Sequence, residues 1–152
     1  MNNKVIHVLS RAIIIDQNQI LLCKTLGAWS NFYFLPGGHI EHNESAQQAL
    51  LRELMEETGQ PFTIKRFLGC LEYSFDSKIC HDHEYNLIFE TTPVQIQVHQ
   101  TLPQLEPHIE LEWIYLSKLN DIKFFPEPLK TLIPEWLKNN HAQNFYSKMV
   151  EN

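Results

Sequence analysis

Runs of β-branched and aliphatic residues, separated by short polar segments, predict most of the secondary structure. The first run covers residues 5–15 and predicts a buried strand. The polar residues 16–19 then predict a turn, and residues 20–24 the returning strand of a hairpin. Comparable runs predict further strands at 32–35, 62–73, 85–90 and 111–116. The polar segment 76–84 is expected to be a loop, and the proline-rich segment 93–109 to be irregular.

Two segments show helical spacing instead. Residues 45–58 are predicted to form a helix, because Ser45 and Gln48 can form a capping box and Gly59 suits a left-handed C-cap. Near the C-terminus the apolar residues recur at helical spacing, namely Leu129, Leu132, Ile133, Trp136 and Leu137. Pro134 falls inside that pattern and predicts either a kinked helix or two short helices.

The order of these elements predicts a mixed α/β layer structure, with strands on both sides of a central helix and a second helix at the end. The chain has 152 residues and contains no internal repeat, low-complexity tract or long linker. A chain of this length can bury a sizeable core on its own, so we expect a single domain over residues 1–152.

Charge is concentrated in one segment. Residues 38–59 contain five glutamates and one arginine, a net charge of −4, which leaves −2 of the total of −6 for the rest of the chain. No run of lysine or arginine is present, so binding to polymeric nucleic acid is not expected. Three widely spaced cysteines, no signal-peptide pattern and no apolar stretch of about 20 residues favour a cytoplasmic protein without membrane spans.

Three of these glutamates share one face of the predicted helix. At about 100° per residue, Glu53, Glu56 and Glu57 fall within an arc of about 100°. Carboxylates this close repel one another unless a cation lies between them. Oxygen ligands select hard cations, first Mg²⁺ and then Mn²⁺. In general, such a face can instead belong to a solvated helix that is stabilised by i,i+4 charge pairs and binds no metal.

The spacing around these glutamates is specific. Gly38 is followed after five residues by Glu44, and after seven more by the segment 52–59, RELMEETG; Pro36-Gly37 precedes it. This pattern resembles the signature of the Nudix hydrolases, which cleave diphosphates linked to a second moiety using magnesium. Every fixed polar and glycine position is present, and Gln60 is the one departure, where the family usually has an aliphatic residue. The resemblance is specific over residues 34–60, and it implies an α/β/α sandwich around a central mixed sheet.

The resemblance also implies a metal site. Glu56 and Glu57 would be the principal ligands of Mg²⁺ or Mn²⁺. Glu53 would be either a further ligand or the base that deprotonates the attacking water. The Gly37 carbonyl would complete the inner shell.

Other residues would support this site. Arg52 would orient the glutamates through a bidentate, charge-assisted contact, and Glu44 would support that contact. Some family members recruit a further base from outside the signature, and Glu84, Glu106 and Glu110 are candidates for that role.

Substrate contacts are expected near the signature. Trp29, Phe32 and Phe34 could stack on a nucleobase, although core packing is expected for at least one of the two phenylalanines. His81 or His83 could contact phosphate at the rim of the cleft. Together with Cys80 these histidines could instead form a zinc-binding interaction module, but the sequence has no second ligand pair at zinc-site spacing.

The sequence therefore predicts a metal-dependent pyrophosphohydrolase acting on a small nucleotide-type substrate, such as a nucleoside triphosphate or a nucleotide sugar. The substrate markers of the ADP-ribose and diadenosine-polyphosphate subfamilies are missing, because Phe75 and residues 76–78 stand at the corresponding positions. The alternative is a non-catalytic Nudix-fold regulator that binds a nucleotide. The sequence leaves open whether the protein is a monomer or a homodimer.

Overall fold

The computed structural model describes residues 5–27, 31–76, 81–96, 100–138 and 144–150, without the side chain of His81. The strands are β1 (Ile6–Asp16), β2 (Gln19–Thr25), β3 (Tyr33–Phe34), β4 (Gly37–His39), β5 (Phe62–Asp76), β6 (His81–Pro93), β7 (Ile109–Tyr115) and β8 (Phe145–Lys148). The helices are α1 (Ala46–Thr58), the 3-10 helix η1 (Leu116–Asp121) and α2 (Leu129–Lys138). The strands belong to one eight-stranded sheet in the described part of the chain.

The sheet is mixed and is centred on β1. The order is β3-β2-β1-β6-β5-β8, with β4 also pairing with β1 and β7 with β2. The pairs β1–β6 and β5–β8 are parallel, whereas the other pairs are antiparallel. β1 and β2 are joined by a tight turn in which Gln17 and Asn18 both have positive φ, the geometry of a type I′ hairpin.

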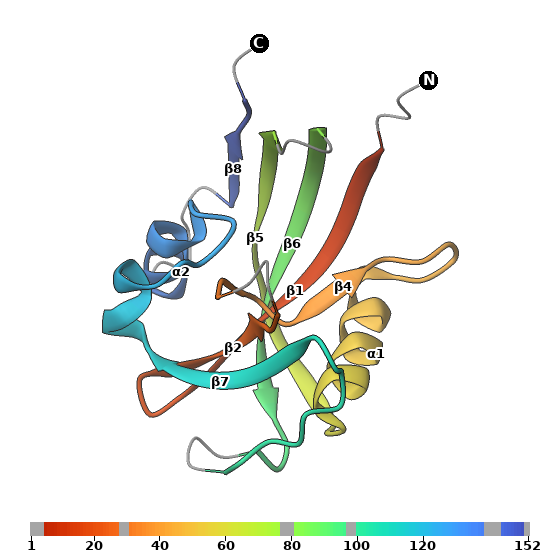
Figure 1. Ribbon diagram of the computed structural model, residues 1–152. Coiled ribbons are helices and arrows are strands. Elements are labelled where there is room, and N and C mark those ends of the chain that lie inside the picture. Colours follow the sequence, from red (N-terminus) through yellow and green to blue (C-terminus); the bar gives the residue numbers. More distant parts are fainter. Residues whose placement is uncertain (1–4, 28–30, 77–80, 97–99, 139–143, 151–152) are drawn as a thin grey trace.

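The helices α1 and α2 lie on opposite sides of the strands (Figure 1). Successive side chains of a strand point to opposite faces, so β1 contributes to two cores. Ala12 and Ile14 pack in the cluster that contains Leu50 of α1, whereas Ile13 packs in the cluster that contains Ile133 of α2. The predicted α/β/α sandwich is therefore confirmed.

The segment 76–84 is the main error of the sequence prediction. The sequence predicts a polar loop there, but β5 continues to Asp76 and β6 begins at His81, while residues 77–80 lie outside the described part of the chain. His83 pairs with Ser74 and Glu84 with Tyr73 across this long hairpin. These polar residues are only partly buried on a strand, so their composition resembles that of a loop although their backbone groups are paired.

The C-terminal region differs from the prediction in smaller ways. Pro134 lies inside α2, which is one helix, so the division into two short helices is wrong. Buried Ile133 and Trp136 on either side of the proline anchor the helix against the core. The helix η1 and the short strands β4 and β8 were not predicted. No helix among the described residues is both long enough and apolar enough to cross a membrane.

Candidate active site

Both ends of α1 are fixed by the caps that the sequence predicts. The Ser45 hydroxyl accepts a hydrogen bond from the Gln48 backbone N–H at 3.2 Å, and the Gln48 side chain accepts one from the Ser45 N–H at 2.9 Å. Gly59 has φ +68 and donates its N–H to the Met55 carbonyl at 2.8 Å. These caps set where the helix begins and ends, and therefore which direction its glutamates face.

Arg52 connects the helix to the segment before it. Its Nε and Nη2 donate to the two carboxylate oxygens of Glu44 at 2.8 and 2.9 Å, a bidentate contact. Its Nη1 donates to Glu53 Oε1 at 2.7 Å, and Nη2 also donates to the His39 carbonyl at 3.1 Å. The hydrogen bonds from Arg52 lower the pKa of Glu44. The bidentate contact is therefore made with Glu44, whereas Glu53 receives a single hydrogen bond from Arg52 that restrains its carboxylate.

Glu57 is buried, with 6% of its surface exposed. Its Oε2 accepts a hydrogen bond from the Gly37 N–H at 3.0 Å, and it forms no ion pair with any described residue. The pKa of Glu57 is raised to about 8, mainly by burial and to a smaller extent by the charges of Glu106 and Glu53, whereas the hydrogen bond from Gly37 and the charge of Arg11 act against this rise. An unpaired buried carboxylate is costly, so this position is suited to a cation.

The glycines before the helix are each required for a different reason. Gly37 has φ +123, and a Cβ atom there would lie 2.1 Å from the Ser10 carbonyl oxygen on β1. A Cβ atom on Gly38 would lie 2.4 Å from Glu53 Cδ and 2.6 Å from both of its carboxylate oxygens. Gly37 is therefore needed for the pairing of β4 with β1, and Gly38 leaves the space that the Glu53 carboxylate occupies.

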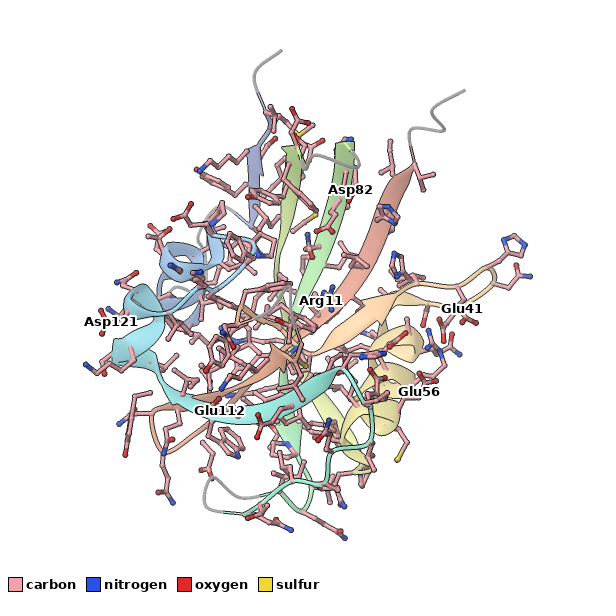
Figure 2. All side chains as sticks on the ribbon, viewed as in Figure 1. Arg11, Glu41, Glu56, Asp82, Glu112 and Asp121 are labelled. Atoms are coloured by element: carbon pink, nitrogen blue, oxygen red, sulfur yellow. The ribbon has the colours of Figure 1, made fainter. Side chains whose placement is uncertain are left out.

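Arg11 on β1 belongs to the same site, although the sequence analysis missed it. Its Nη1 donates to the Gly37 carbonyl at 2.7 Å and to the Leu35 carbonyl at 3.2 Å. Its guanidinium carbon lies 5.7 Å from the centre of the Phe34 ring. Figure 2 shows Arg11 near the centre of the molecule and Glu56 on α1. An arginine inside the apolar run 5–15 was the signal that could have revealed it.

A cavity of about 840 Å³ opens beside Arg11. Five aromatic side chains contribute to its lining: Phe32, Phe34, Tyr73, Phe75 and Phe125. The polar lining includes Arg11, Glu84 and Asn86. Cavities of this size and mainly apolar character, with a few polar groups, are typical of small-molecule sites.

The predicted substrate-binding residues have different outcomes. Phe34 and Glu84 do line the cavity. His83 and Glu110 are not among its lining residues. His83 Nε2 lies 3.0 Å from the Glu72 carboxylate, and Glu110 is exposed at the start of β7. Trp29 lies outside the described residues.

Two further predictions concern Glu106 as a base and the zinc-binding module. Glu106 is close enough for its charge to raise the pKa of Glu57. The zinc-module alternative depends on Cys80 and on the side chain of His81, which lie outside the described part of the chain, so it stays a prediction.

The donor set suits a hard divalent cation. Glu53, Glu56, Glu57 and the Gly37 carbonyl offer only oxygen ligands, and Glu57 is buried. Within the described ranges, no three His, Cys, Asp or Glu side chains converge closely enough to hold a metal ion as they stand. Glu53 is turned toward Arg52, and the side chain of Glu56 is 53% exposed, so metal binding requires side-chain rotation.

Comparisons with known proteins agree with the site. The sequence model of the family described as NUDIX domain matches residues 6–136. The chain belongs to the Nudix family. It is 30% identical over 116 residues to a CTP pyrophosphohydrolase of Escherichia coli (strain K12), covering 72% of this chain and 82% of that protein. It is 31% identical over 80 residues to an 8-oxo-dGTP diphosphatase of Proteus vulgaris, covering 51% of this chain and 71% of that protein.

Solved structures of the Nudix family share the fold. A NUDIX hydrolase from Nitrosomonas europaea has a TM-score of 0.70 at 21% identity, covering 88% of this chain and 90% of that chain. The E. coli ORF135 protein has a TM-score of 0.64 at 22% identity, covering 92% and 96%. The family match and the named relatives identify the protein as a hydrolase that acts on diphosphate bonds.

Proposed function

We propose that the protein is a metal-dependent pyrophosphohydrolase that cleaves the diphosphate of a small nucleotide-type substrate. The observation that carries this proposal is the contact of Arg11 with Gly37. Arg11 lines the aromatic cavity and donates to the Gly37 carbonyl, while the Gly37 N–H donates to Glu57. A nucleobase in the cavity would thus be connected to the carboxylates of α1 through Arg11 and Gly37.

Glu56, Glu57 and the Gly37 carbonyl would hold the cation, with Glu53 as a further ligand. Mg²⁺, or Mn²⁺ in its place, would supply charge stabilisation for the phosphate oxygens and acidify a bound water. The Glu57 side chain is positioned by the Gly37 N–H. Its burial without an ion-pair partner among the described residues gives the site a preference for a positively charged occupant.

In the reaction a water oxygen forms a bond to one phosphorus and the bridging P–O bond breaks, which leaves two phosphate-terminated products. Glu53 could accept the proton of that water or bind the cation, and both roles remain open. The contact with Arg52 orients the carboxylate for either role. Arg52 would act as a positioning residue, because its other contacts are to Glu44 and the His39 carbonyl.

Nucleotides are the substrates that the cavity suits best. The aromatic lining offers flat apolar surfaces for a base, and Arg11 offers a charge for phosphate. The names of the relatives support the same class, since they refer to CTP and 8-oxo-dGTP.

The proposal is tested with a panel of nucleoside triphosphates, nucleotide sugars and dinucleotides in the presence of Mg²⁺ or Mn²⁺, with released phosphate and pyrophosphate as the readout. Glu56→Gln and Glu57→Gln should each lower turnover by about 100-fold or more, whereas Glu135→Gln on exposed α2 surface should not. Unchanged activity in both site variants would refute the metal assignment. Nucleotide binding without turnover under either metal would favour the non-catalytic regulator.

A further inference from the structure

Glu84 is a carboxylate on the lining of the mainly apolar cavity. It is partly buried, and its one hydrogen bond from the described residues comes from Asn86 Nδ2 to Oε2 at 3.2 Å. It forms no ion pair with any residue in the described part of the chain. Among the described residues Oε1 therefore has no donor, so a ligand in the cavity can supply a hydrogen-bond donor to this partly buried carboxylate.

Asn86 holds this carboxylate in place. It is buried, with 1% of its surface exposed, and its amide donates to Glu84 from two residues further along the same strand. The other carboxylate on the cavity lining, Asp76, already has an interaction within the protein. Glu84 is thus the lining carboxylate whose hydrogen-bonding capacity is available to a ligand.

The position of Glu84 is set by the strand register. Glu84 on β6 pairs with His7 on β1, and Arg11 pairs with Ile88. His7 and Arg11 are four residues apart on β1, so the backbone positions of Glu84 and Arg11 are separated by about 13 Å along the strand direction. Arg11 and Glu84 therefore lie toward different ends of the cavity lining, one cationic and one anionic. Tyr73, also on the lining, pairs directly with Glu84 and places an aromatic ring beside the carboxylate.

We propose that Glu84 selects the nucleobase, favouring bases with an exocyclic amino group over counterparts that lack it. A carboxylate only accepts hydrogen bonds, so the group that faces it must donate. Cytosine and guanine present amino groups, whereas uracil and hypoxanthine place a carbonyl or a C–H at the equivalent position. A carbonyl oxygen facing Glu84 would leave two acceptors in contact, which costs binding energy. This inference rests on the proposed function, with the phosphates of the same nucleotide directed toward Arg11.

The test compares matched nucleotide pairs, CTP with UTP and GTP with ITP, in wild type and in Glu84→Gln. Wild type should favour the amino member of each pair by at least about tenfold in kcat/KM, the range that one good base contact provides. Glutamine both donates and accepts, so the preference in the variant should fall to about threefold or less. Glu135→Gln, which removes the same charge from an exposed helix position, should keep the wild-type preference.

Binding provides a readout that does not depend on hydrolysis. Calorimetric titration with the α,β-methylene analogues of CTP and UTP should show the same tenfold preference as a ratio of Kd values, whether or not any nucleotide is turned over. Absence of all turnover would contradict the proposed function, whereas a Kd ratio near one in wild type would overturn the role of Glu84.

Two further results would also overturn it. An equal loss of turnover for both members of each pair in Glu84→Gln would indicate a general-base role instead. An unchanged preference in a folded variant would show that another group reads the base. If circular dichroism shows that the variant is unfolded, the wild-type ratios alone still decide, because they test the amino preference directly.

Discussion

Replacing Glu57 by glutamine is expected to stabilise the metal-free protein at alkaline pH and to have little effect at acidic pH. Burial raises the pKa of this carboxyl from 4.5 to about 8. A raised carboxyl pKa means that the folded state holds its proton more tightly than the unfolded chain. Below about pH 4.5 both states are protonated, so the group has no pH-dependent effect. As the pH rises toward 8 the unfolded state gains by ionising while the folded state does not, and the folded protein loses stability.

The size of this loss follows from the pKa values. Each pKa unit is worth about 1.4 kcal/mol, so a rise from 4.5 to about 8 sets an upper limit of about 5 kcal/mol. Rotation of the side chain toward water would relieve part of it, and we expect about 3 kcal/mol between pH 4.5 and pH 8.5. Glutamine at this position can still accept the hydrogen bond from the Gly37 N–H but carries no charge.

The assay is urea unfolding in the presence of a chelator, at several values between pH 4.5 and pH 8.5, for wild type and Glu57→Gln. With m values of about 1–3 kcal/mol/M, a difference of about 3 kcal/mol moves the midpoint by about 1 M or more. As a control, Glu56→Gln removes the same charge from the adjacent, half-exposed side chain and should change stability by less than about 1 kcal/mol. Parallel pH profiles for wild type and Glu57→Gln would refute the idea that an uncompensated carboxylate is buried here. Adding Mg²⁺ at pH 8.5 should then stabilise wild type more than Glu57→Gln, because only wild type offers the full ligand set.

Three further substitutions test other parts of the site. Gly38→Ala should leave the unfolding midpoint nearly unchanged but lower kcat about tenfold or more, because the new methyl group displaces the Glu53 carboxylate; a wild-type kcat would contradict this. Arg11→Lys should keep the charge but lose the two contacts to backbone carbonyls, including that of Gly37, so kcat should fall more than KM rises; a change in KM alone would indicate that Arg11 only binds substrate. Ser45→Ala removes the N-cap and should lower the unfolding free energy by about 1 kcal/mol in thermal or urea unfolding, with kcat retained; no loss of stability would mean that the cap is dispensable.

The part of the site that the sequence predicts is the part built from neighbouring residues. Ser45 and Gly59 act within one turn of the helix ends, so their roles follow from local rules. The bidentate contact between Arg52 and Glu44 spans a single loop and the first turns of α1, and the resemblance supplied its partners. For these residues, short-range spacing is sufficient.

The remainder depends on pairing between distant segments. Arg11 reaches Gly37 only because β1 and β4 pair in one register, which no local pattern indicates. Glu84 was identified as a candidate, but its place on a strand rather than in a loop was not, because alternating polar residues on a partly buried strand resemble loop composition. The cavity is formed by side chains from separate strands and loops, and its shape follows from tertiary packing alone.

The position of β1 in the sheet also determines how the site should respond to heat. β1 is hydrogen-bonded to β2, β4 and β6, so its central amides can exchange with solvent only when several strand pairs separate at once. Amide hydrogen exchange should therefore be slowest around Ala12 and Ile13, one and two residues from Arg11. Because Arg11, which pairs with Gly37, lies on this segment, the geometry of the site should persist until global unfolding. Activity should then disappear in the same transition as the fold, without an earlier phase of local inactivation.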